Sequence, residues 1–366
     1  MRIMKTGQSY RMIYLIDLEY VETRYTSQWK TEFPQSIADK TGQDITVIEG
    51  PVIESDVSSG SFLDFATTNI YKSEQTKILA QFFAEGKVQD GDHFVFADAL
   101  HPGVLNLKYM ADLLKINIVT HGLWHAGSYD ANDFLGREIG PVPWVRYTEL
   151  AMFDAYSKNY FASQFHIGMF ASVMAPDPTQ QEYLQSKMVR TGWPMEYLGP
   201  TIDRDTIGVE KQDLILFPHR NAPEKQLEIF KDLEVELPEY DFVNCAEFKL
   251  KKEDYHRLLG QAKMVFSANL QETLGISCYE IMITGGLPFV PNRLSYMEMY
   301  DDVFKYPSDW TENWEQYQNN RYGLKQRIKY LMENYNLPEI QGALNNNKEK
   351  LEKHYFSAGN LYQELI

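Results

Sequence analysis

Two glutamates in the second half of the chain have a spacing that could bind a substrate. Glu272 and Glu280 stand eight positions apart in QETLGISCYEIMITGGLPFV, with Gly275 between them. A turn at Leu274 and Gly275 would leave Glu272 in a loop and place Glu280 inside a helix that begins near Ile276. Free backbone N–H groups at such a helix start can bind an anion, for example a diphosphate. The alternative is that both glutamates only interact favourably with the helix dipole.

A second group of polar residues follows apolar runs of strand length in the first half. Asp98 and His121 come at the ends of HFVFADAL and INIVTHG, and the next segment, WHAGSYD, adds His125 and Asp130. Loops at the carboxyl ends of parallel strands line the ligand crevice of α/β proteins, so these side chains could contact a bound ligand. A histidine after a strand can equally be a packing residue.

The elements that must position these residues alternate between strand and helix. Strand-like runs occur at 11–18, 44–50, 93–100 and 116–122, and a helical pattern spans 105–115. A second series of strand candidates comprises 187–194, 213–220, 240–248, 263–270 and 286–292, with helical patterns at 222–233 and 253–262. This order predicts two α/β domains with parallel sheets that face each other across a cleft, with a hinge in Met195 to Lys211.

Composition narrows the class of protein. The 366 residues are 44% hydrophobic, and 35 Lys and Arg against 51 Asp and Glu give a net charge of −16, which repels phosphate backbones and anionic lipids. Two cysteines without a C-x-x-C partner indicate neither a disulfide framework nor a cysteine zinc site. This cysteine content fits the reducing cytoplasm. Without an apolar run of 18 residues, no stable membrane insertion is expected.

Two segments carry a resemblance to a known family. The string ETLGISCYEIMITGGLPFV resembles the E-x7-E signature of retaining glycosyltransferases with the GT-B fold, especially family four. About 50 residues earlier, LFPHRNAPEK is similar to the G-R-x-x-x-E-K segment of that family, with Arg220 and Lys225 five positions apart. The two motifs in this order are more specific than either alone, and the resemblance covers residues 187 to 300 well.

The resemblance implies a fold and its boundaries. The chain would comprise a Rossmann-like acceptor domain (1–185), a Rossmann-like domain for a nucleotide-diphosphate sugar (186–345) and a C-terminal helix returning to the first domain (346–366).

The resemblance also implies roles for residues of the donor site. Arg220 and Lys225 would bind the diphosphate together with the amides of residues 274–276, Glu272 the donor sugar, and Glu280 the ribose. His121 and His125 would reach the reacting groups alongside Glu272. The acceptor hydroxyl is itself the nucleophile, and neither a metal nor another cofactor is expected.

The first loop departs from the family pattern, because no glycine occurs between Gly7 and Gly42. Arg24, Trp29 and Lys30 stand there instead and could contact the acceptor through phosphate pairing and base stacking. Asp98 and Asp130 could also contact the acceptor. A helix with a solvated face explains the first-loop pattern equally well.

The preferred acceptor is a hydroxymethylated pyrimidine in bacteriophage DNA; the cytoplasm is then that of the host. The alternatives are a glycan acceptor, which the negative charge favours, or a nucleotide-binding protein of this fold without catalysis. The oligomeric state is left open.

Overall fold

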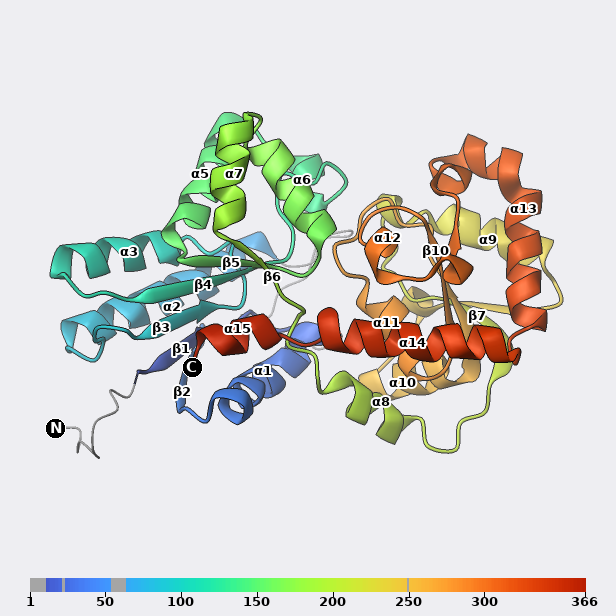
Figure 1. The fold of residues 1–366 in the computed structure, drawn as a ribbon, viewed down its shortest axis with the longest axis horizontal. Coiled ribbons are helices and arrows are strands. Elements are labelled where there is room, and N and C mark those ends of the chain that lie inside the picture. Colours follow the sequence, from blue (N-terminus) through green and yellow to red (C-terminus); the bar gives the residue numbers. More distant parts are fainter. Residues whose placement is uncertain (1–10, 22–23, 54–63, 249) are drawn as a thin grey trace.

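Two α/β domains lie side by side in the computed structural model, which describes residues 11–21, 24–53, 64–248 and 250–366 (Figure 1). The first domain contains a parallel sheet with the strand order β2-β1-β3-β4-β5-β6. Its strands are β1 (Ile13–Ile16), β2 (Ile45–Ile48), β3 (His93–Phe96), β4 (Val119–Trp124), β5 (Lys158–Phe161) and β6 (Met188–Arg190). Its helices are α1 (Tyr25–Thr41), α2 (Phe65–Ala84), α3 (Gly103–Leu114), α4 (Phe134–Glu138), α5 (Pro143–Ala155), α6 (Gln164–Met174) and α7 (Pro178–Ser186).

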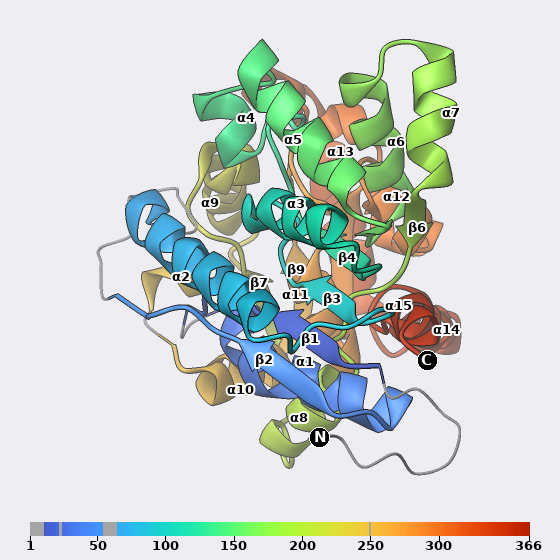
Figure 2. The same ribbon diagram turned by 90° about the vertical axis from the view of Figure 1, so that its left-hand side faces the viewer.

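Helices cover both faces of the first sheet, which explains why its central strands are apolar runs without alternation. All four residues of β1 are buried. Ile13 and Leu15 pack in the core that includes α1, whereas Tyr14 and Ile16 pack in the core that includes α2, α3 and α5. Figure 2 shows α1 on one side of the sheet and α2 and α3 on the other. The predicted parallel sheet is therefore confirmed.

The second domain repeats this architecture, with the strand order β11-β10-β9-β7-β8. Its strands are β7 (Gln212–Phe217), β8 (Asp241–Asn244), β9 (Ala262–Phe266), β10 (Leu287–Pro291) and β11 (Lys305–Tyr306). Its helices are α8 (Leu198–Asp205), α9 (Leu227–Glu236), α10 (Lys252–Gln261), α11 (Ile276–Ile283), α12 (Tyr296–Met299) and α13 (Trp314–Glu333). The four strands predicted between residues 213 and 292 all form.

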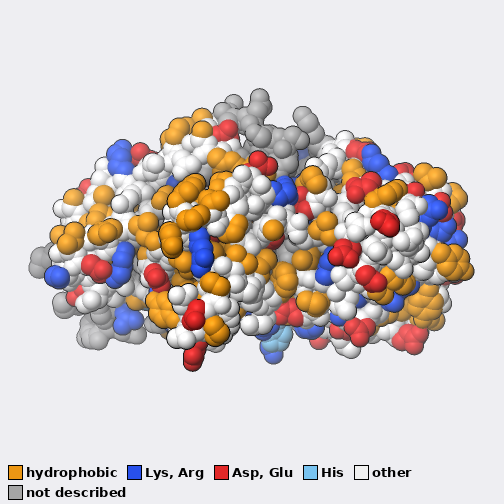
Figure 3. All heavy atoms as spheres, turned by 90° about the horizontal axis from the view of Figure 1, so that it is seen from above, with side chains coloured by type: hydrophobic (Ala, Val, Ile, Leu, Met, Phe, Trp, Pro, Cys, Tyr) orange, Lys and Arg blue, Asp and Glu red, His pale blue; other side chains and the backbone are white. Residues whose placement is uncertain are grey.

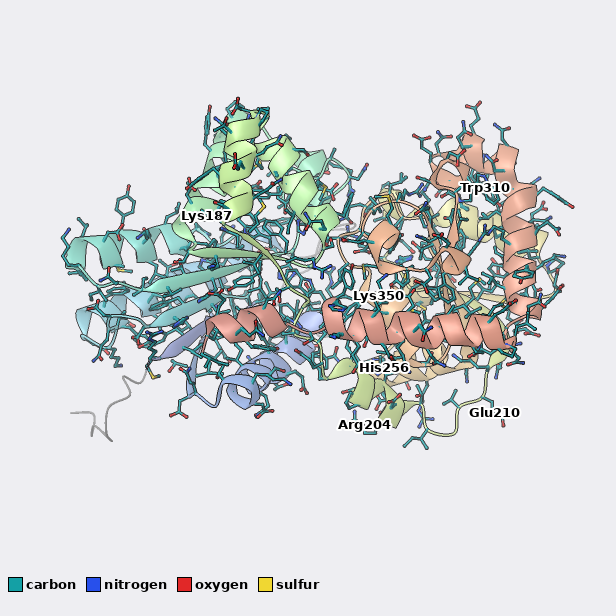
Figure 4. All side chains as sticks on the ribbon, viewed as in Figure 1. Lys187, Arg204, Glu210, His256, Trp310 and Lys350 are labelled. Atoms are coloured by element: carbon teal, nitrogen blue, oxygen red, sulfur yellow. The ribbon has the colours of Figure 1, made fainter. Side chains whose placement is uncertain are left out.

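One predicted strand belongs to the other domain. The run 187–194 was expected to open the second series, but β6 pairs with β5 and closes the first sheet, with Asn159 opposite Met188. The domain boundary at 185/186 is therefore wrong, and the first domain extends beyond Arg190. The predicted hinge also contains α8, which packs on α10 and α11. The Nδ1 atom of His256 lies 2.7 Å from Oδ2 of Asp205 and ties α8 to α10. Figure 4 labels His256 and Arg204, the residue of α8 that precedes Asp205.

The C-terminal segment returns to the first domain, as predicted, but starts earlier than residue 346. Helix α14 (Pro338–His354) packs on α11 of the second domain, and α15 (Gly359–Glu364) packs on α1 of the first. Between them the chain crosses the linker so closely that a Cβ atom at Gly192 would lie 2.4 Å from the carbonyl oxygen of Ser357. Within the described ranges, no helix has the length and apolar character needed to cross a membrane.

Candidate functional site

A cavity of about 610 Å³ opens between the two domains. Arg24, Tyr25 and His125 line it from the first domain, and residues that follow β7, β8 and β9 line it from the second. These segments leave the carboxyl ends of their strands, where open α/β sheets bind ligands. The cleft predicted from the alternation of strands and helices is confirmed.

Glu272 and the start of α11 form one wall of this cavity. Gly275 precedes the helix in the left-handed conformation (φ 75°), and a Cβ atom there would lie 2.8 Å from the ring of Tyr296, so glycine is required. Leu274, Gly275 and Ile276 all line the cavity. The Oε1 atom of Glu272 accepts the N–H groups of Thr273 at 3.1 Å and Leu274 at 3.4 Å. The predicted turn and helix start are confirmed.

Glu280 reaches the same cavity from inside α11. Its carboxylate is almost fully buried, and its Oε2 atom accepts a hydrogen bond from the hydroxyl of Tyr255 at 3.0 Å. The Nζ atom of Lys252 lies 3.8 Å from Oε1. A carboxylate fixed in this way can still accept hydrogen bonds from ligand hydroxyls.

Arg220 faces the cavity directly after β7. Its NH2 group donates to Oε1 of Glu224 at 2.6 Å, in a salt bridge whose carboxylate is 2% exposed. Its Nε–H is buried and finds no acceptor among the described residues. The side chain is nevertheless 28% exposed, so the part of the guanidinium that does not pair with Glu224 can donate to an anion in the cavity.

Lys225 differs from the expectation of a direct diphosphate contact. Its Nζ atom donates to the backbone carbonyl of Gln271 at 2.6 Å and lies 3.6 Å from Oε2 of Glu272. Lys225 is 6% exposed and is not among the described residues that line the cavity. In this structure its charge supports the loop that carries Glu272.

His125 is the residue of the first domain that comes closest to the predicted role. Its Nε2–H donates to the carbonyl of Ala97 at 2.7 Å, because a carbonyl only accepts, so Nδ1 accepts from the hydroxyl of Tyr25 at 3.0 Å. Burial lowers the pKa of His125, which keeps the ring neutral. With both ring nitrogens engaged and the ring packed against Trp193, His125 lines the cavity but keeps no ring nitrogen for a ligand in this state.

Asp98 lines a smaller cavity of about 210 Å³ that shares Arg24, Tyr25 and His125 with the larger one. The Oδ2 atom of Asp98 lies 2.8 Å from Nζ of Lys72. Burial raises the pKa of Asp98, but the charge of Lys72 together with the hydrogen bonds from Lys72 and from the N–H of Leu100 holds the pKa below its usual range. The smaller cavity extends the cleft into the first domain beside a fixed carboxylate.

His121 does not reach the cleft, so the prediction that it lies beside the reacting groups is wrong. It lies in the middle of β4 and is fully buried. Its Nε2 atom lies 2.9 Å from Nδ1 of His93, and its Nδ1 atom lies 3.0 Å from the hydroxyl of Tyr160. These contacts link three neighbouring strands inside the core and leave no ring nitrogen for a ligand.

Three residues predicted to bind the acceptor also lie outside both cavities. Trp29 is 3% exposed and packs in the core through its contacts with Phe33 and Trp193. Lys30 pairs with Glu49 at 3.3 Å. Asp130 is buried in its loop, where burial raises its pKa. Of the residues predicted to bind the acceptor, Arg24 and Asp98 are the two that line one of these two cavities.

The buried histidines predict a loss of stability in acid. Burial lowers the pKa of His93 to about 4 and those of His121 and His166 to about 3. Because the unfolded chain takes up these protons near pH 6.5, the free energy of unfolding should fall as the pH drops from 6.5 towards 4, by roughly 3 kcal/mol from His93 alone. Urea unfolding between pH 7.5 and 4 measures this loss, and His121→Gln should reduce it. A free energy of unfolding that does not change over this range would contradict the prediction.

Sequence reasoning missed residues that hold the donor wall. Arg293 donates to the carbonyls of Ala268, Asn269 and Ser308 at 2.7 to 2.8 Å and thereby fixes the loop before Glu272. Thr273 donates through Oγ1 to the carbonyl of His125 at 3.1 Å, across the domain boundary. Thr273 stands inside the motif and could have been noticed, but backbone acceptors distant in sequence gave no signal for Arg293.

The described part of the chain offers no candidate metal site. Across the described ranges, no three His, Cys, Asp or Glu side chains are grouped so that they could hold a metal ion. Metal independence stays a prediction.

Comparisons with known proteins identify the fold. No family model matches the sequence, and no curated protein matches it. The catalytic domain of starch synthase IV from Arabidopsis thaliana, bound to ADP and acarbose, aligns over 98% of this chain and 98% of its own, with a TM-score of 0.59 and 10% identity. A glycosyltransferase from Rickettsia africae aligns over 98% and 99% (TM-score 0.57, 15% identity), and Anabaena HepE in complex with UDP-glucose over 97% and 98% (0.53, 11%). The chain therefore has the two-domain GT-B fold of these glycosyltransferases over nearly its whole length.

Proposed function

We propose that this protein is a retaining glycosyltransferase that moves a sugar from a nucleotide-diphosphate donor to an acceptor hydroxyl. The observation that carries the proposal is the convergence of Glu272, the start of α11, Arg220 and Glu280 on one cavity between two domains. The fold is shared with proteins whose structures contain UDP, UDP-glucose or ADP. Fold alone does not define a reaction, so the proposal depends on this site.

Each wall of the cavity suits one part of such a donor. Arg220 and the N–H groups at the start of α11 suit the diphosphate, whose charge grows as the bond to the sugar breaks. Glu280 suits the ribose hydroxyls, and Glu272 the hydroxyls of the sugar. The acceptor hydroxyl attacks the anomeric carbon on the face from which the diphosphate departs, so no protein nucleophile is required.

The smaller cavity beside Asp98 is the proposed acceptor site. The structure weakens the case for a hydroxymethylated pyrimidine in bacteriophage DNA as the acceptor, because Trp29 is buried in the core and Lys30 pairs with Glu49. On the face seen in Figure 3, Lys and Arg side chains are scattered among acidic and apolar ones, whereas a DNA-binding surface gathers them. A glycan or small soluble acceptor is therefore the favoured form of the proposal, and DNA is one arm of its test.

The first test is a thermal-shift panel of nucleoside diphosphates and their sugars. A ligand present at about 100 times its Kd should stabilise the folded protein by roughly 2.7 kcal/mol. We expect one nucleotide and one of its sugars to raise Tm, after which transfer assays on glycans and on hydroxymethylated DNA identify the acceptor. The anomeric configuration of the product tests retention. If no nucleotide raises Tm, the proposed donor site is wrong.

A further inference from the structure

We infer that Arg137, in the first domain, is a positioning residue for the diphosphate of the donor and acts through Glu224 on Arg220. The inference rests on the proposed function. The Glu224 carboxylate is 2% exposed and lies between two arginines from different domains. Its Oε2 atom is 2.8 Å from NH1 of Arg137, and its Oε1 atom is 2.6 Å from NH2 of Arg220. Arg137 is not among the described residues that line the cavity, whereas Arg220 is.

The segment that carries Arg137 is itself anchored to the donor wall. Asp133 caps α4 by accepting the N–H of Leu135 at 3.1 Å, and NH1 of Arg137 donates to the carbonyl of Asn132. The side-chain amide of Asn132 donates to the carbonyl of Leu270 at 3.3 Å. The N–H of Leu270 in turn donates to the carbonyl of Glu224 at 2.8 Å. The first domain thus contacts the loop before Glu272 and the loop after Arg220 at the same place.

The charges in this cluster make the diphosphate site depend on domain contact. With both arginines in place, one buried carboxylate is shared by two positive charges, and the three side chains of Arg137, Glu224 and Arg220 together carry a charge of +1. If the domains separate, Arg137 withdraws and Glu224 neutralises Arg220 alone. A diphosphate therefore binds the joined domains more tightly than the separated ones, and by linkage its binding favours the joined arrangement.

The test compares the affinities of UDP, ADP, GDP and CDP, measured by calorimetry, for the full chain and for Arg137→Gln. For the diphosphate that binds the wild type, we expect the variant to bind about tenfold more weakly, which is ~1.4 kcal/mol. The matching nucleoside without phosphates should bind both proteins equally, because the effect acts on the diphosphate. Arg257→Gln removes the same charge from a side chain that is 54% exposed on α10, and it should leave the affinity unchanged.

The possible failures of this test are distinguishable. If none of the four diphosphates binds the wild type, the proposed function fails, and the inference fails with it. If one binds the wild type and Arg137→Gln equally, the inference alone is wrong and the donor site stands. Arg137→Lys keeps the positive charge, and because NH1 alone makes both contacts of Arg137, one ammonium group can replace it. This variant should bind the diphosphate within about twofold of the wild type, and a loss as large as that of Arg137→Gln would contradict the role of charge. An equal loss of nucleoside binding would show a general structural defect and would also overturn the inference.

Discussion

Arg220→Ala should weaken the binding of the nucleoside diphosphate by about 10- to 100-fold, because a hydrogen bond to a charged group contributes about 1.5 to 3 kcal/mol. Arg220 lines the cavity and its side chain is 28% exposed, so N–H groups that do not pair with Glu224 can reach phosphate oxygens. The loss of kcat/KM for transfer should be larger, about 10²- to 10³-fold. A fixed cation stabilises the leaving diphosphate most in the transition state.

The fold should tolerate this change, which makes the result interpretable. Glu224 keeps its second partner, Arg137, at 2.8 Å, so the truncation does not leave an isolated buried carboxylate. The measurements are calorimetry with the diphosphate and steady-state kinetics of transfer, with Arg257→Ala as a control that removes a charge from the same domain. Unchanged affinity in Arg220→Ala would exclude this guanidinium from the diphosphate site.

The donor wall could be predicted from sequence because its geometry is local. The turn before α11 requires a residue with positive φ, and Gly275 supplies it. Its position therefore indicates where α11 begins relative to Glu272 and Glu280. Trp29 was predictable in another sense, since Trp29, Phe33 and Ile37 recur every four residues and form a buried stripe on α1. That apolar spacing favours packing over a role in the acceptor site, and the prediction for Trp29 did not take it into account.

The wall formed by the first domain depended on details that sequence patterns do not resolve. β4 continues to Trp124, two residues beyond the predicted strand end, so His121 falls inside the strand and His125 is the residue that emerges at the cleft. The pairing of Arg137 with Glu224 joins positions 87 residues apart and has no local signature. Strand β6 has only three residues, all half-buried. A pattern this short does not show which of the two sheets the strand joins.

Glu272→Gln should lower kcat for transfer by about 10²- to 10³-fold while the affinity for the nucleoside diphosphate changes less than about threefold. Glu272 lies in the cavity near the helix start, where a sugar attached to the diphosphate would be placed. A carboxylate binds sugar hydroxyls by charge-assisted hydrogen bonds, and these should strengthen as positive charge develops on the sugar. An interaction that grows in the transition state affects kcat more than binding.

The comparison with Glu280 separates the two glutamates by function. Glu280→Gln removes charge on the side of the cavity bounded by Tyr255 and Lys252, so it should weaken the nucleoside and the diphosphate alike and raise KM more than it lowers kcat. Glu253→Gln, at a side chain that is 67% exposed, is the matched control and should change neither. If Glu272→Gln and Glu280→Gln gave the same ratio of effects on kcat and KM, the division of sugar and ribose between them would be wrong. An unchanged kcat in Glu272→Gln would remove the carboxylate from the transition state, since the amide keeps the shape of the side chain and alters only its charge and hydrogen bonding.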